Sequence, residues 1–250
     1  MRRRELLAMG AAAIAAPLRG RAAGMADTVA RVKPSVVLVG TYRETDTPRF
    51  QLRGSGFLIG RGQQVVTCSH VLPGADADLV VQVLRPDGGW ARHPVHLGAL
   101  DERSDLALLT LDSAIGPGLP IGDSGKVREG DDLAFMGFPI GNLLGYSHVV
   151  HRAMVSSITA ALLPSPDAER LRENTIRGLR SGNFSLFQLD AVAYPGNSGG
   201  PLFRPETGEV VGVMNMVLLK GTRESALSQP SGIAYAVPAA RLRELMERAR

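Results

Sequence analysis

The chain has 250 residues, of which 44% are hydrophobic, so it is long enough to bury a sizeable core in one or two domains. Its single cysteine excludes an internal disulfide and therefore the disulfide-stapled classes of small secreted protein. The formal net charge is +4, but residues 1–24 alone hold five arginines and one glutamate. The remainder is therefore neutral, and its charge gives no argument for a nucleic-acid or acidic-membrane partner.

The first 24 residues have the organisation of an export signal. Three arginines, Arg2 to Arg4, precede an apolar run from Leu6 to Ala16 and the small residues Ala22-Ala23-Gly24. The apolar run is shorter than the roughly 20 residues that a transmembrane helix needs. Because Arg3-Arg4 resembles a twin-arginine signal, we predict export to the periplasm or the extracellular space by that route. The alternative is a frayed basic N-terminus of a cytosolic enzyme.

Residues 25–115 have the pattern of a first β-rich unit. Short apolar runs bounded by turn residues predict six strands, at 36–40, 56–59, 64–67, 79–84, 91–97 and 106–111. The third run leads into His70, and Asp105 directly precedes the sixth. Taken alone, His70 is interpreted as a histidine at a strand end whose hydrogen bonds are made within the fold. Asp105, taken alone, is interpreted as a turn or cap residue.

Residues 116–130 are rich in turn formers and predict a linker. Residues 131–237 predict a second set of six strands, at 132–137, 147–158, 184–189, 201–203, 210–217 and 232–237. The polar stretch 160–183 predicts a long surface loop. Residues 238–250 predict one amphipathic helix, because Leu242, Leu245 and Met246 share a helical face. The 29 glycines and 16 prolines agree with an all-β chain that makes many turns.

The stretch from Gly196 to Pro201 is unsuited to the interior of a strand or helix, because glycine weakens both elements and proline lacks a backbone N–H donor. Its small residues leave backbone N–H groups beside the hydroxyl of Ser198. Acyl transfer needs this combination of a nucleophilic oxygen and amide donors for the oxyanion that forms. A serine nucleophile also needs a base and an orienting carboxylate, for which His70 and Asp105 are the candidates.

Three blocks, Thr67–Leu72, Ser104–Leu109 and Gly196–Leu202, resemble the catalytic blocks of the trypsin-like serine proteases, and of their HtrA branch in particular. The order His70, Asp105, Ser198 is the chymotrypsin order. Three supporting blocks agree, at 54–59, 189–191 and 232–238. The resemblance implies two six-stranded antiparallel β-barrels with the active site in the cleft between them. It also implies a branch member without a PDZ domain, because a short helix is all that follows residue 237.

The resemblance implies the roles of the site residues. His70, Asp105 and Ser198 form the catalytic triad, and Gly196, Asn197 and Ser198 form the oxyanion hole. The specificity pocket is lined by Val192, Met214, Asn215, Met216 and Val217. An uncharged, narrow pocket of this kind predicts a small or medium aliphatic residue on the acyl side of the cut bond.

The sequence therefore predicts a serine endopeptidase that cleaves exported or misfolded proteins. The alternative is an inactive barrel pair that binds peptides or a partner protein. We expect no cofactor, no nucleic-acid partner, no stable membrane anchor and no metal site, since His148 and His151 would face opposite sides of one strand. Cys68 is expected to pack as a small buried hydrophobe. The oligomeric state is left open, with the trimer of HtrA-type proteins as one alternative.

Overall fold

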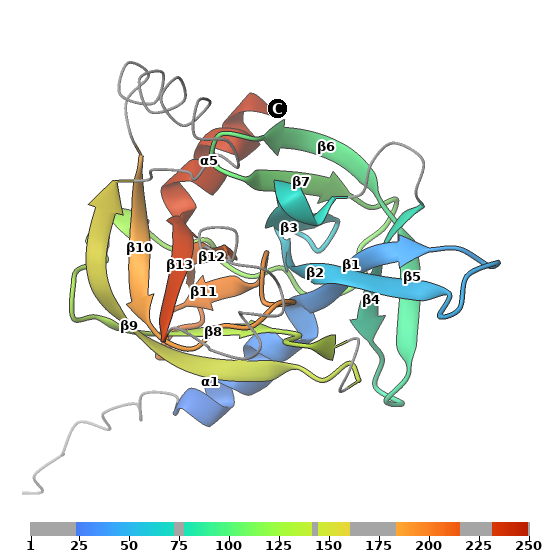
Figure 1. The fold of residues 1–250 in the computed structure, drawn as a ribbon, viewed down its shortest axis with the longest axis horizontal. Helices are drawn as coiled ribbons and strands as arrows, with labels where there is room; N and C mark the ends of the chain where they lie inside the picture. Colours follow the sequence, from blue (N-terminus) through green and yellow to red (C-terminus); the bar gives the residue numbers. More distant parts are fainter. Residues whose placement is uncertain (1–23, 73–77, 142–144, 161–183, 216–231, 250) are drawn as a thin grey trace, which may run out of the picture.

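The computed structural model describes residues 24–72, 78–141, 145–160, 184–215 and 232–249. Two antiparallel β-structures lie side by side, as Figure 1 shows, with the N-terminal one on the right and the C-terminal one on the left. The prediction of an all-β chain with a short C-terminal helix is confirmed.

The N-terminal half is a seven-stranded sheet that follows a short helix, α1 (Met25–Val32), and a 3-10 turn, η1 (Lys33–Ser35). Its strands are β1 (Val36–Tyr42), β2 (Phe50–Ile59), β3 (Gln64–Cys68), β4 (Leu79–Leu84), β5 (Trp90–Pro94), β6 (His96–Asp101) and β7 (Leu106–Thr110). They are arranged in the order β5-β4-β1-β2-β3-β7-β6.

This half differs from the sequence prediction in two details. It is a seven-stranded sheet with two edge strands, whereas a closed six-stranded barrel was expected. The strand expected at 91–97 is divided into β5 and β6, with Val95 between them. Pro94 ends β5 because it has no N–H to continue the ladder. Since β5 and β6 are the two edges of the sheet, this one bent segment carries the chain from one edge to the other.

The C-terminal half is a closed six-stranded barrel, in the order β10-β13-β12-β11-β8-β9. Its strands are β8 (Asp132–Gly137), β9 (Val149–Ala160), β10 (Ser185–Asp190), β11 (Pro201–Phe203), β12 (Val210–Asn215) and β13 (Ile233–Pro238). All but one residue of the predicted surface loop at 160–183 lie outside the described residues.

The segment between the two halves is bonded to both of them. Leu119 forms a parallel bridge with Ile59 of the first sheet, and Ile121 forms one with Val210 of the barrel. A further 3-10 turn, η3 (Ser124–Lys126), follows, and its Ser124 Oγ accepts a hydrogen bond from the N–H of Ala240 at 2.9 Å. These bonds fix the barrel beside the sheet, which is a precondition for a site made from both.

The C-terminal helix, α5 (Ala239–Arg248), packs against β6, β7 and β12 and thus spans the two halves. Leu242 and Leu245 are buried, and Met246 packs against the same core, as the predicted helical face requires. The guanidinium of Arg248 pairs with Asp101 of β6 at 2.7 Å. Among the described residues, the helices are too short and too polar to cross a bilayer.

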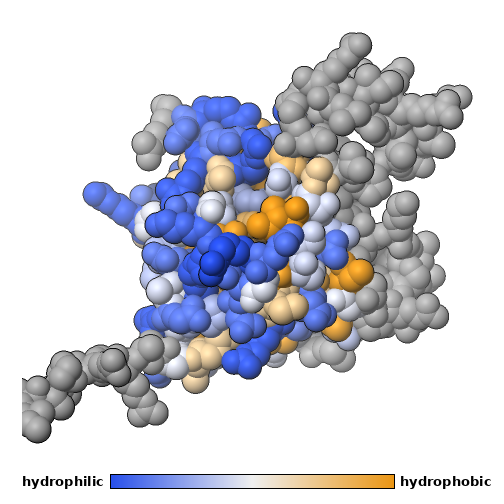
Figure 2. Space-filling view, turned by 90° about the vertical axis from the view of Figure 1, so that its left-hand side faces the viewer, coloured by the Kyte–Doolittle hydropathy of each residue, from blue (hydrophilic) through white to orange (hydrophobic). Residues whose placement is uncertain are grey.

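The surface of the barrel is mixed rather than uniformly polar. β9 carries three exposed large apolar side chains, Val150, Met154 and Ile158, alternating with polar ones. Figure 2 shows the face on the left of Figure 1, where small apolar areas are separated by hydrophilic side chains.

Candidate active site

His70 and Asp105 are brought together by the pairing of two strands. His70 lies in a 3-10 turn, η2 (Ser69–Val71), directly after β3, and Asp105 directly precedes β7. These strands are paired with Cys68 opposite Leu106, so both side chains emerge at the same end of the ladder. The imidazole Nδ1 of His70 lies 2.6 Å from Asp105 Oδ2.

The Asp105 carboxylate is held by donors from two distant parts of the chain. Its Oδ1 accepts from the His70 N–H at 2.9 Å and from the hydroxyl of Ser69. Its Oδ2 accepts from Asn215 Nδ2 at 2.9 Å in addition to His70 Nδ1. Asp105 itself has a φ of 54°, a conformation that costs free energy in a residue other than glycine and is typical of functional sites.

These contacts determine the charge of Asp105. Burial by itself raises the pKa of the carboxyl group, but the hydrogen bond and the charge of His70, with the hydroxyl of Ser69, outweigh it. The pKa of Asp105 is therefore below its ordinary value. At neutral pH the group is a carboxylate that fixes the tautomer of His70, with the proton on Nδ1 and Nε2 free to accept another.

Ser198 lies between β10 and β11, in a loop packed against both halves. Its carbonyl oxygen accepts a hydrogen bond from the N–H of Ser55 on β2, at 2.8 Å. A Cβ atom on Gly54 would stand 2.9 Å from that same oxygen and 2.7 Å from Val71, so only glycine permits this approach. The loop that carries Ser198 therefore lies beside the turn that carries His70. No hydrogen bond joins the two side chains among the described residues, and such bonds often tighten only when substrate binds.

The backbone of the loop is held in a conformation that favours glycine at position 196. Gly196 has a φ of 104°, and a Cβ atom there would stand 2.2 Å from the carbonyl oxygen of Phe138. Its own carbonyl is turned toward Ser55, whose hydroxyl donates to it at 2.6 Å and accepts from the N–H of Phe138 at 3.0 Å. Among the described residues, the N–H groups of Gly196 and Ser198 have no acceptor.

Asn197 requires a correction to the sequence prediction. Its N–H donates to the carbonyl oxygen of Tyr194 at 3.1 Å and is not available to an oxyanion. Of the three predicted residues, Gly196 and Ser198 have an N–H group without an acceptor among the described residues. The amide of Asn197 is fully buried, and neither its nitrogen nor its oxygen finds a partner among the described residues.

A comparison with known protein families identifies the family of this chain. A model described as "Trypsin-like peptidase domain" matches residues 54–213. The chain belongs to this family. A probable periplasmic DegP-like serine endoprotease of Marinomonas sp. (strain MWYL1) is 33% identical over 186 residues, 74% of this chain and 33% of that protein. The mitochondrial serine protease HTRA2 of Bos taurus is 32% identical over 228 residues, 90% of this chain and 43% of that protein.

Solved structures agree with this relationship. The HtrA-type protease AlgW with a tripeptide superposes with a TM-score of 0.66 at 26% identity, covering 90% of this chain and 63% of that one. The chain thus spans less than half the length of the two curated relatives named above.

The predicted specificity pocket of this trypsin-like domain is described only in part. Val192 is exposed, whereas Met216 and Val217 lie outside the described residues. Met214 and Asn215 require a correction. The side chain of Met214 is fully buried in the core of the barrel, and the amide of Asn215 donates to Asp105. Neither side chain is placed to contact a substrate.

Cys68 is fully buried, as predicted, and its thiol donates to the carbonyl oxygen of Met214 at 3.2 Å. Burial raises the pKa of this thiol well above its ordinary value, and the charge of Asp105 raises it further. Cys68, His70 and Asp105 lie close enough together to be considered as metal ligands. They fit a metal poorly, because His70 and Asp105 already bond to each other and a protonated thiol is a weak ligand.

Proposed function

We propose that this chain is a serine endopeptidase. The observation that carries the proposal is the Asp105 carboxylate, which is bonded to His70 Nδ1 beside a serine loop in which two N–H groups have no acceptor among the described residues. A packed core needs no such arrangement. In the proposed reaction Ser198 Oγ attacks the scissile carbonyl, and His70 takes its proton and later delivers it to the leaving amine.

The oxyanion that forms is stabilised by the N–H groups of Gly196 and Ser198. Losing one such donor costs about 3 to 4 kcal/mol in comparable enzymes, so this term is large. Asp105 stabilises the imidazolium form of His70 at the same time. The reaction uses side chains and backbone alone and requires no cofactor.

The alternative, an inactive barrel pair that binds peptides, needs none of this geometry. A fluorophosphonate probe separates the two functions, because it labels only an activated serine. We expect stoichiometric labelling of the wild-type protein and none of Ser198→Ala or His70→Ala. An unlabelled wild-type protein that still binds peptides would favour the inactive module.

The proposed substrates are polypeptides, including misfolded and exported proteins. The exposed Val192 offers no charge to a substrate side chain, which supports a preference for small or medium aliphatic residues on the acyl side. Mapping the sites cut in a denatured proteome tests this preference. A dominant preference for Arg, Lys or Glu would contradict the pocket without affecting the triad.

We further propose an exported enzyme in the periplasm or outside the cell. The basic residues and the apolar run in residues 1–24 support an export signal. The DegP-like relative is described as a probable periplasmic protein, which supports the same location. The proposed organisation is an N-terminal barrel at 25–115, a linker at 116–130, a C-terminal barrel at 131–237 and a helix at 238–250. A trimer of this chain is one alternative for its assembly.

A further inference from the structure

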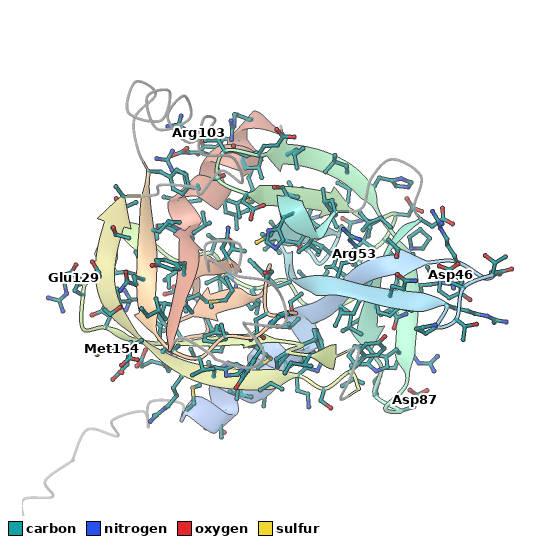
Figure 3. The ribbon with its side chains drawn as sticks, viewed as in Figure 1. Asp46, Arg53, Asp87, Arg103, Glu129 and Met154 are labelled. Atoms are coloured by element: carbon teal, nitrogen blue, oxygen red, sulfur yellow. The ribbon has the colours of Figure 1, made fainter. Side chains whose placement is uncertain are left out.

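Arg53 is an exposed cation fixed beside the turn that carries His70. It lies on β2, and its guanidinium donates from Nε to the carbonyl oxygen of Val71 at 2.7 Å and from Nη2 to that of Leu72 at 3.2 Å. Figure 3 labels Arg53 where β2 passes the end of β3. The guanidinium is thus held next to the residues that immediately follow His70.

The same strand borders the serine loop. Gly54, the residue after Arg53, lies in close approach to both Val71 and the carbonyl oxygen of Ser198. Ser55, one residue further, donates to that oxygen. β2 therefore runs along the site, and Arg53 is its first exposed side chain beyond the serine loop.

Among the described residues, no carboxylate neutralises the charge of Arg53. Both of its acceptors are carbonyl oxygens, and it forms no ion pair with a described carboxylate. Other arginines are paired, as Arg204 is with Asp131 and Arg248 with Asp101. Two hydrogen bonds have already fixed the side chain, so an incoming anion would not have to order it again.

The direction of the substrate follows from the proposed chemistry. His70 protonates the leaving amine, so the part of the substrate after the cut bond lies on the side of His70. We propose that Arg53 forms a subsite for an acidic side chain, Asp or Glu, on the leaving side of the cut bond. This inference rests on the proposed peptidase function. In an extended peptide successive side chains point to opposite faces, so only one of the first two leaving-side positions faces Arg53.

The test uses two pairs of otherwise identical peptides, with Asp or Asn at the first or at the second leaving-side position. Asp and Asn have nearly the same shape, so the ratio of their kcat/KM values isolates the charge. We expect the wild-type protein to prefer Asp at one of the two positions by about three- to fivefold at low salt, with the preference shrinking as salt rises. Arg53→Gln should reduce that ratio to one, and Arg53→Lys should retain part of it.

The matched control is Arg92→Gln, because Arg92 is also exposed on this sheet and lies over the ring of Tyr42 on the edge strand β5. That variant should keep the wild-type ratio. If the wild-type protein cuts the Asn peptides but shows an Asp/Asn ratio of one at both positions, the subsite is wrong while the peptidase function stands. A preference that survives in Arg53→Gln would also reject it. Failure to cut any of the four peptides, together with absent fluorophosphonate labelling, would reject the peptidase function and this inference together.

Discussion

Asn215 donates from Nδ2 to Asp105 Oδ2 across 2.9 Å, although the two residues are 110 positions apart. The bond links the last described residue of β12 in the barrel to the start of β7 in the first sheet. Through the adjacent residue, Met214, the same strand also accepts the N–H of Gly199 in the serine loop at 2.9 Å. β12 therefore fixes the Asp105 carboxylate and the serine loop relative to each other.

Asn215→Ala should lower kcat/KM by about 10- to 100-fold with little change in KM. A hydrogen bond to a charged group is worth about 1.5 to 3 kcal/mol, and this one orients the carboxylate that holds His70. Peptide cleavage kinetics provide the measurement. Ser156→Ala is the control, because Ser156 Oγ donates to the carbonyl oxygen of Gln188 on the exposed side of β9. Equal losses in both variants would contradict the role of Asn215.

The pH dependence of stability provides a second readout for Asn215. The pKa of Asp105 is lowered in the folded protein, so its ionisation stabilises the fold above the ordinary value of 3.8. That contribution is lost as the pH falls through the lower, folded value. Removing a donor reduces the depression of the pKa. The difference in unfolding free energy between wild-type and Asn215→Ala should therefore be constant above about pH 5 and shrink below about pH 4.

Gly196→Ala should abolish activity, with a loss of at least about 100-fold in kcat. The new Cβ atom would stand 2.2 Å from the carbonyl oxygen of Phe138, so the loop must move and its N–H donors with it. Gly88→Ala is a matched control, because Gly88 has a φ of 84° but no atom within 4 Å of the new Cβ. That variant should lose about 1 kcal/mol of stability and keep its kcat. Similar kcat values for the two variants would rule out the oxyanion role of Gly196.

The sequence predicted the parts of the site that depend on local pattern. Asp105, His70 and Ser198 each lie beside a β-type run or a glycine-rich loop, and they were selected by their order and by the three matching blocks rather than by any one residue alone. Asn215 and Ser55 were not assigned their roles, because each acts on a residue more than 100 positions away. Nothing local to either one indicates which partner the fold will bring to it.

The same limit explains the errors in the pocket and in the sheet. A strand alternates its side chains, but the sequence alone does not say which face of 210–217 meets the cleft, so Met214 and Asn215 were placed as pocket residues. The run at 91–97 has a continuous β pattern, but the chain bends after Pro94 and passes from one edge strand of the sheet to the other. The short helix α1 was missed because its few apolar residues adjoin the predicted leader.

Changing Arg3 and Arg4 to lysine should block export if residues 1–24 form a twin-arginine signal, because that route requires the arginine pair. The measurement is the fraction of the protein recovered outside the cytoplasm, with Arg19→Lys as the control that leaves the pair intact. N-terminal sequencing of the exported wild-type protein should begin near Met25. Unchanged export of the double variant would favour the ordinary secretory route, and a mature chain that still begins at Met1 would remove the signal.

His148 and His151 should respond in opposite ways to substitution by phenylalanine, because Nε2 has a hydrogen-bond partner in His148 and none among the described residues in His151. His148 Nε2 donates to the carbonyl oxygen of Val36 at 2.9 Å and so joins the barrel to β1. His151 stacks on Phe135 at 4.5 Å, but its buried Nε2 has no partner among the described residues. His148→Phe should therefore destabilise the protein by about 1 kcal/mol, whereas His151→Phe should be neutral or stabilising.

His148→Phe and His151→Phe should each also make the free energy of unfolding fall less steeply as the pH is lowered. Burial lowers the pKa of each imidazole below its ordinary value of 6.5. At a pH between the lowered pKa of the folded protein and the ordinary value of 6.5, the unfolded chain binds the proton more readily than the folded protein does. The free energy of unfolding is therefore highest above about pH 6.5 and falls as the pH drops below it. Urea unfolding of Ser198→Ala, which avoids self-cleavage, measures this slope from pH 7.5 to 5. A slope that neither phenylalanine variant reduces would show that these two histidines do not carry the acid sensitivity.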